Sequence, residues 1–149
     1  MTDLAMRQPY RFVSAASSAP NPVVRIAGEG IQRAFADPSR ETTRAIRRLG
    51  ALPAGWAGAG SVAVSTRTLA TALRFNSCLW FWGAKPKVGP GEDGEVVLEW
   101  DLSSGRSLYC RVLGTVVEMV AFDSAKDILE VSLPPEPAAQ VAKVLLEHL

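Results

Sequence analysis

The sequence Ser77-Cys-Leu-Trp-Phe-Trp82 stands where the chain changes from a helical to a strand-like pattern. Before it, apolar residues recur at the three- and four-residue spacing of a helix that begins at Ser65, a good N-cap residue. After it, Gly83 and Pro86 supply stop signals, and an alternating pattern follows. Helices first and strands second predict an α+β domain.

Trp80, Phe81 and Trp82, here called the aromatic cluster, make the end of this expected helix apolar around most of its circumference. Trp80 and Trp82 point about 200° apart on a helix, so one packing face cannot bury both rings. We weigh two interpretations. The cluster is sandwiched between the sheet and a second element of the chain, or part of it is a surface for a partner, since Trp is enriched at interface hot spots.

The second half of the chain predicts a four-stranded antiparallel sheet. Alternation is clearest in Glu95-Val-Val-Leu-Glu-Trp-Asp101, where Val96, Leu98 and Trp100 share one face. Short turns connect successive strands, so neighbours are antiparallel and form a meander. The expected strands are residues 95–101, 107–113, 115–122 and 127–133, preceded by a loop over 85–94. Two or three helices are expected to cover the apolar face, including a C-terminal helix over about 135–149.

The N-terminal region has a different composition. Residues 1–22 are rich in Ser, Ala and Pro and have no regular period, which predicts a flexible, disordered tail. Residues 23–35 have a helical rhythm that Gly28 and Gly30 weaken. At 149 residues the chain suits one core. The expected boundaries are 1–22 for the tail and 23–149 for a single domain, helical over about 23–84 and sheet-forming over about 94–133.

The sequence Asp37-Pro-Ser-Arg-Glu41 has the residues of a helix start, because Asp can cap the first turn and Pro suits the first helical position. We expect this helix to run to about Leu49, with Gly50 ending it. Its outer side, here called the arginine face, consists of Arg40, Arg44, Arg47 and Arg48. These arginines either solvate the outside of a helix or pair with the oxyanions of an acidic protein or a nucleic acid.

The net charge of +1 hides an asymmetry between the two parts of the chain. Residues 1–88 contain 12 Lys+Arg against 4 Asp+Glu, a net of +8. Residues 89–149 contain 4 against 11, a net of −7. Such a division can serve attraction between the two parts, head-to-tail assembly, or a basic face for an acidic partner.

Residues suited to metal or cofactor chemistry are scarce. Cys78 and Cys110 lie in apolar contexts, which predicts two buried free thiols. His148 is the one histidine, so no metal-ligand spacing exists. The sequence Gly58-Ala-Gly-Ser-Val-Ala63 matches a dinucleotide fingerprint only superficially, because a helix and Pro53 precede it where a strand is required. We expect no metal and no cofactor.

The sequence also gives little support for catalytic carboxylates. Glu99 and Asp101 lie two residues apart on an expected strand, but nothing beside them predicts a pocket that would separate their pKa values. An enzyme would need such a pocket, walled by Trp56 and Trp100, around these carboxylates. We therefore expect a protein that is not an enzyme.

The spacing Leu52-Pro-x-Gly-Trp-x-Gly-x-Gly, then a helix, then Pro86-x-Val-x-Pro-x-x-Asp-Gly-x-Val-x-Leu-Glu-Trp100, resembles a group of small bacterial proteins without an assigned function. The resemblance covers about residues 52–100. Ala57 departs from the pattern, since an acidic or polar residue is expected there in the relatives. The resemblance implies a bacterial source and no activity or catalytic residue.

The leading hypothesis is a small module that binds another protein, or a second copy of itself, without catalysis. Such a module could be an adaptor, an antitoxin- or immunity-type inhibitor, or a subunit of a larger assembly or defence complex. Nucleic-acid binding through the arginine face is the second hypothesis. No apolar run approaches about 20 residues and the start lacks a signal-peptide pattern, which predicts a cytoplasmic protein without a membrane partner. The candidate binding residues are Trp80, Phe81, Trp82, Arg40, Arg44, Arg47 and Arg48.

Overall fold

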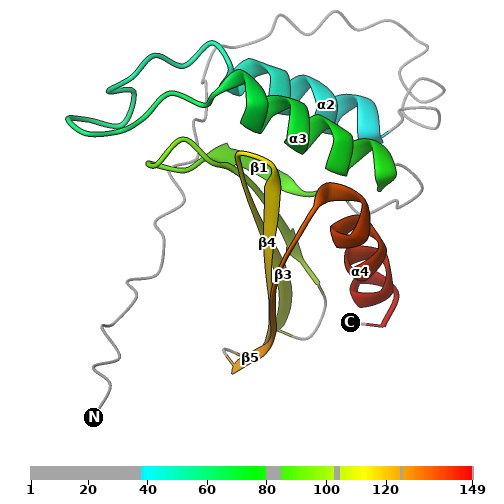
Figure 1. Cartoon of the computed structure of the whole chain (residues 1–149). Coiled ribbons are helices and arrows are strands. Elements are labelled where there is room, and N and C mark those ends of the chain that lie inside the picture. The colour runs from blue at the N-terminus through cyan, green and yellow to red at the C-terminus, as the bar shows by residue number, and fades with distance from the viewer. Residues whose placement is uncertain (1–37, 80–84, 103–104, 125, 149) are drawn as a thin grey trace, which may run out of the picture.

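The computed structural model describes residues 38–79, 85–102, 105–124 and 126–148 (Figure 1). Within these ranges, the predicted α+β class is confirmed. The expected tail, the helical rhythm of residues 23–35 and the aromatic cluster lie outside the described residues. No described helix is both long enough and apolar enough to cross a membrane. The elements are α2 Pro38–Leu49, α3 Thr66–Cys78, β1 Lys87–Pro90, β2 Val96–Asp101, β3 Arg106–Leu113, β4 Val116–Asp123, β5 Lys126–Leu133 and α4 Pro135–His148.

The sheet is an antiparallel meander in the order β1-β2-β3-β4-β5, one strand more than predicted. The extra strand, β1, occupies part of the segment predicted to be a loop, and its Val88 lies opposite Leu98 of β2. Its sequence, Lys-Val-Gly-Pro, gives no alternating pattern. Proline is tolerated there because β1 is an edge strand. The other four strands lie within one residue of their predicted bounds.

The helices pack against one face of the sheet (Figure 1), with α2 against β1, α3 over β2 to β4, and α4 over β3 to β5. The predicted inward set of β2, Val96, Leu98 and Trp100, is buried. Val97 is buried as well, although alternation placed it on the polar face. Arg111 lies opposite Val97 and reaches toward Glu95, so its aliphatic stem can cover this valine.

Helices α2 and α3 are joined by both apolar and polar contacts. Gly50, after α2, lies beside Leu69 near the start of α3. The Asn76 amide, near the end of α3, donates hydrogen bonds to the Ser39 carbonyl and to Oγ1 of Thr43 at 3.3 and 3.1 Å. The two helices are therefore antiparallel, with the end of α2 beside the start of α3.

Helix α3 begins as predicted, because Ser65 Oγ accepts a hydrogen bond from the Thr68 N–H. It ends at Cys78, before the predicted end at Trp82. Leu79 has left helical geometry, with ψ near 2°, and its N–H bonds to the Asn76 carbonyl. A tightened last turn of this kind ends the helix ahead of the stop signals that follow.

The β1–β2 hairpin is fastened to the segment that precedes α3. The Val62 N–H donates to the Glu92 carbonyl at 2.8 Å. Gly94 has a φ of +84°, and a Cβ there would lie 2.9 Å from the Ala63 carbonyl oxygen. Only glycine fits both the backbone conformation and the close approach. This turn lies within the segment predicted to be a loop.

Candidate functional site

Helix α2 positions the arginine face. Thr42, Ile46 and Leu49 lie on its inner side and are buried. The helical period then forces Arg40, Arg44, Arg47 and Arg48 outward, and all four are exposed. The structure thus places these four predicted site residues together on one open surface.

Most of the positive charge of this surface is not used inside the fold. The guanidinium groups of Arg44, Arg47 and Arg48 make no ion pair or hydrogen bond with a described residue, although the charge of Arg44 contributes to the lowered pKa of Glu41. The one carboxylate on α2, Glu41, pairs with Lys85, which lowers the pKa of Glu41. In contrast, three arginines elsewhere are each paired with a carboxylate: Arg74 with Glu136, Arg106 with Asp123, and Arg111 with Glu118.

Sequence reasoning missed Arg67, a further exposed arginine on α3. Arg67 is exposed and makes no ion pair with any residue that the structure describes. It lies in the first turn of α3, on the flank that also carries Arg74, whereas Leu69 and Asn76 lie on the flank that faces α2. The helical spacing of Arg67, Ala70 and Arg74 could have revealed this outer side.

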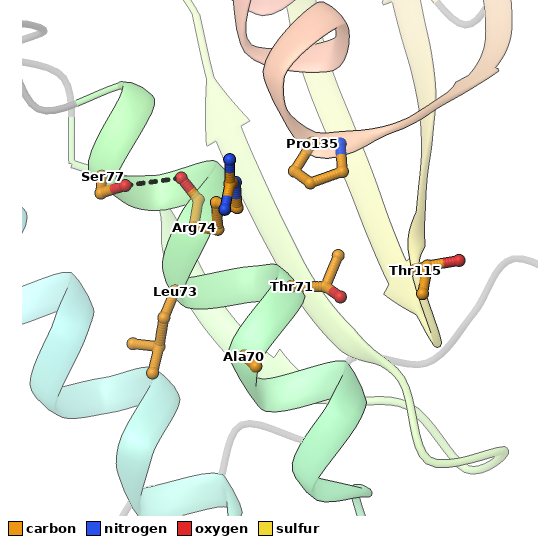
Figure 2. Close-up of a pocket in the computed structure, with 7 residues that line it drawn as sticks. All are labelled: Ala70, Thr71, Leu73, Arg74, Ser77, Thr115 and Pro135. Atoms are coloured by element: carbon orange, nitrogen blue, oxygen red, sulfur yellow. Dashed lines mark hydrogen bonds between the residues drawn. The ribbon is translucent and has the colours of Figure 1, made fainter.

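A shallow depression of about 550 Å³ lies between α3, the start of α4 and the β3–β4 turn (Figure 2). At its rim, Arg74 pairs with Glu136, and the pKa of Glu136 is lowered first by a hydrogen bond from its own backbone N–H and then by Arg74. The Ser77 hydroxyl donates to the Arg74 carbonyl, as Figure 2 shows, and the Thr71 hydroxyl donates to the Gly114 carbonyl. The protein already satisfies these polar groups. The lining residues are Ala70, Thr71, Leu73, Arg74, Ser77, Thr115 and Pro135.

A polar cluster on the sheet face opposite the helices was also missed. Arg111 of β3 bonds to Glu118 of β4 with Nε at 2.8 Å, and its Nη1 lies 3.4 Å from Oε1 of Glu95. The Glu95 side chain is only 3% exposed, and its Oε2 accepts a hydrogen bond from the Asp93 N–H at 2.9 Å. One arginine thus compensates two carboxylates. Pairing across strands has no signal along one strand, which is why the sequence pattern did not show it.

The candidate carboxylates of β2 have different environments. Burial, and then the charge of Asp101, raises the pKa of Glu99, which is partly buried. A hydrogen bond from Lys87 lowers the pKa of Asp101, which is exposed. Trp100 packs in the core, so it does not form the wall of a pocket around these groups. Within the described ranges, no group of three or more His, Cys, Asp or Glu side chains could hold a metal ion.

Both cysteines are free thiols, as predicted. Cys110 is buried in the core, and burial raises its pKa, which opposes formation of a thiolate. Cys78 is half-buried at the end of α3. Its predicted burial is therefore only partial.

The aromatic cluster lies outside the described residues, so the candidate site that the structure describes is the arginine face. Comparison of the chain with protein-family models, with curated proteins and with solved structures finds no match.

Proposed function

We propose that this protein acts by binding an acidic protein partner through the arginine face of α2. The observation that carries the proposal is the set of three exposed guanidinium groups on one helix face, none of which forms an ion pair with a carboxylate of the described residues. Guanidinium groups present rigid donors that match carboxylates in pairs of hydrogen bonds. An adaptor, an inhibitor of a toxin or a subunit of a larger assembly would each use such a surface.

The geometry of α2 suits an extended acidic surface. Arg40 and Arg48 are about 12 Å apart along the helix axis, given a rise of about 1.5 Å per residue. Their side chains project from a helix whose inner side is fixed by Ile46 in the core. A rigid support reduces the ordering cost of binding. The contact would strengthen association mainly through electrostatic steering, and so would weaken as salt rises.

Nucleic-acid binding is the second candidate, because the same exposed arginines could neutralise phosphates. It predicts that the logarithm of the affinity falls linearly with the logarithm of the salt concentration. The slope of this line should become shallower by about one for each arginine removed. The acidic charge of residues 89–149 disfavours a large nucleic-acid footprint. No aromatic residue interleaves with the arginines on α2 to stack bases.

The test compares affinity capture from extract of the source cells by three forms of the protein. The three forms are the wild type, the double variant Arg44→Gln/Arg48→Gln, and the control variant Lys126→Glu. Lys126 is an exposed residue of β5, and both variants lower the net charge by the same amount. The proposal predicts nuclease-resistant acidic proteins that the wild type and Lys126→Glu retain at low salt and the double variant loses. Equal retention by all three forms contradicts it, and loss after nuclease treatment favours nucleic acid.

A further inference from the structure

The two edges of the sheet differ in their protection against pairing with another strand. Edge strand β1 is short, contains Pro90, and lies against α2, where Lys85 pairs with Glu41. These are common protections of an edge. Strand β5, Lys126–Leu133, contains no proline, and among the described residues no element pairs with its outer side. Among the described strands, β5 therefore offers the longer unpaired edge.

The C-terminal part of β5 is complementary to itself. Leu129, Val131 and Leu133 lie on the helix-covered face, opposite buried residues of β4, and are themselves only partly buried. Glu130 and Ser132 lie on the other face. In an antiparallel pair about a two-fold axis through Val131, Leu129 faces Leu133 of the second copy, and Glu130 faces Ser132. This register pairs apolar with apolar side chains and a carboxylate with a hydroxyl.

Neighbouring registers are less favourable. Centring the pair on Glu130 would set two carboxylates directly opposite each other, which is destabilising. Centring it on Leu129 would include Ile128, the bulged residue that has no partner in β4. A bulge disrupts the ladder locally. Of these three registers, the one centred on Val131 is therefore the most favourable.

Helix α4, in the helical layer that covers the sheet, lies along the same side of the molecule as the β5 edge. Glu136 points toward α3, where it pairs with Arg74. Val141, Val144 and Leu145 lie on the other flank of α4 by helical period, and Val144 is 55% exposed. The apolar surface therefore continues from β5 to the flank of the helix above it.

The size of this surface sets the strength of the contact. The five paired residues 129–133 span about 17 Å, and two layers about 10 Å apart give on the order of 300 Å² per copy. A standard stable interface buries about 800 Å² per partner. The expected contact is thus a concentration-dependent one.

We propose that β5 and α4 form a homodimer interface, in which two β5 strands pair about Val131 and the two sheets become one. The occupant of this edge is a second copy of the chain. The arginine face lies on α2, at the β1 side of the sheet, so dimerisation leaves it free. The dimer would present two arginine faces, one at each end, and would bind a repeated acidic partner with increased avidity.

Site-specific disulfides test the pairing. In the proposed register the two Val131 residues face each other with Cα atoms about 4.5–5.5 Å apart, within reach of a disulfide. Val131→Cys, in a Cys78→Ser background, is expected to form a covalent dimer under mild oxidation. Leu129→Cys is the matched control on the same strand face, because its two copies would be about 13 Å apart.

Sedimentation of the unmodified chain is measured in parallel and requires no variant to fold. A mass that rises from 16.0 kDa toward twice that value with concentration, together with faster cross-linking of Val131→Cys than of Leu129→Cys, is the expected result. A monomer at about 1 mM, where even a millimolar Kd would be visible, overturns the proposal. Equal cross-linking at both positions also overturns it.

Discussion

Thr68 and Thr71 fix α3 to the tip of the β3–β4 hairpin through one backbone group each. Thr68 Oγ1 accepts from the Gly114 N–H at 2.9 Å, and the Thr71 hydroxyl donates to the Gly114 carbonyl at 2.6 Å. Both threonines are buried. The two threonine hydroxyls thereby satisfy the backbone N–H and carbonyl of Gly114, which the hydrogen bonds between β3 and β4 do not.

Replacement of Thr68 by valine is expected to destabilise the fold by about 1–3 kcal/mol, because the partly buried Gly114 N–H would lose its acceptor while the packing volume stays similar. Urea denaturation measures the change. Ser77→Ala is the control, since Ser77 is exposed and its hydroxyl bonds only to the Arg74 carbonyl in its own helix. A Thr68→Val effect no larger than that of Ser77→Ala would show that this contact contributes little.

Glu99 makes the stability of the fold depend on pH, with a sign opposite to that of a typical salt-bridged carboxylate. Because its pKa is raised in the folded state, the folded chain binds this proton more readily than the unfolded chain. Its contribution to stability is therefore most favourable below its ordinary pKa and declines as pH rises through the raised value. Glu99→Gln is expected to stabilise the protein at pH 7 relative to wild type, with the difference shrinking toward pH 4.

Urea denaturation of wild type and Glu99→Gln across this pH range tests the expected sign. Glu92→Gln, in an exposed position of the β1–β2 hairpin, serves as the control. A Glu99→Gln variant that is less stable than wild type at pH 7 would refute the assignment of burial as the main cause.

Among the elements, β2, β3 and β4 are held together on their helix-free face by Arg111. Replacing it with methionine keeps the stem over Val97 but leaves the buried Glu95 carboxylate without a cation. We expect a loss of about 2–4 kcal/mol in unfolding free energy, in line with one-sided removal of a buried ion pair. Glu118→Gln should cost less, because the Glu118 side chain is 47% exposed.

Adding Glu95→Gln to Arg111→Met is expected to recover part of the lost stability, since it removes the unpaired charge. The double variant thereby distinguishes a charge effect from a packing effect. If the double variant were less stable than Arg111→Met by as much as Glu95→Gln destabilises the wild type, the unpaired charge would not be the cause of the stability lost in Arg111→Met.

The elements differ in how far their sequence predicts them. Strands β2 to β5 and helix α2 follow clear periods, and all were predicted within one residue of their bounds. Strand β1 was not, because Gly89 and Pro90 conceal a strand that forms by pairing with β2. The arginine face could be read from a helical period. The Glu95–Arg111–Glu118 cluster depends on the register between three strands, which no single segment encodes.

At the level of the whole molecule, the exposed arginines that the structure describes lie on helices α2 and α3, whereas many of the carboxylates lie on the sheet. The described helices α2 and α3 carry five exposed arginines at 40, 44, 47, 48 and 67, besides the paired Arg74. Three carboxylates of the sheet form ion pairs with cations on neighbouring strands: Asp101 with Lys87, Asp123 with Arg106, and Glu118 with Arg111. The positive charge of residues 1–88 is thus partly available to an external partner, whereas much of the negative charge of the sheet is compensated within the fold.

The most direct test of the arginine face is an NMR titration that observes the Nε–Hε groups of its arginines. A polyglutamate peptide and a duplex of about 20 base pairs are added separately to the labelled protein at low salt. Our account predicts that the peptide shifts the signals of Arg44, Arg47 and Arg48 and leaves the internally paired Arg111 unchanged, and that salt reverses the shift. Unchanged signals at all three positions, or equal shifts at Arg111, would contradict it.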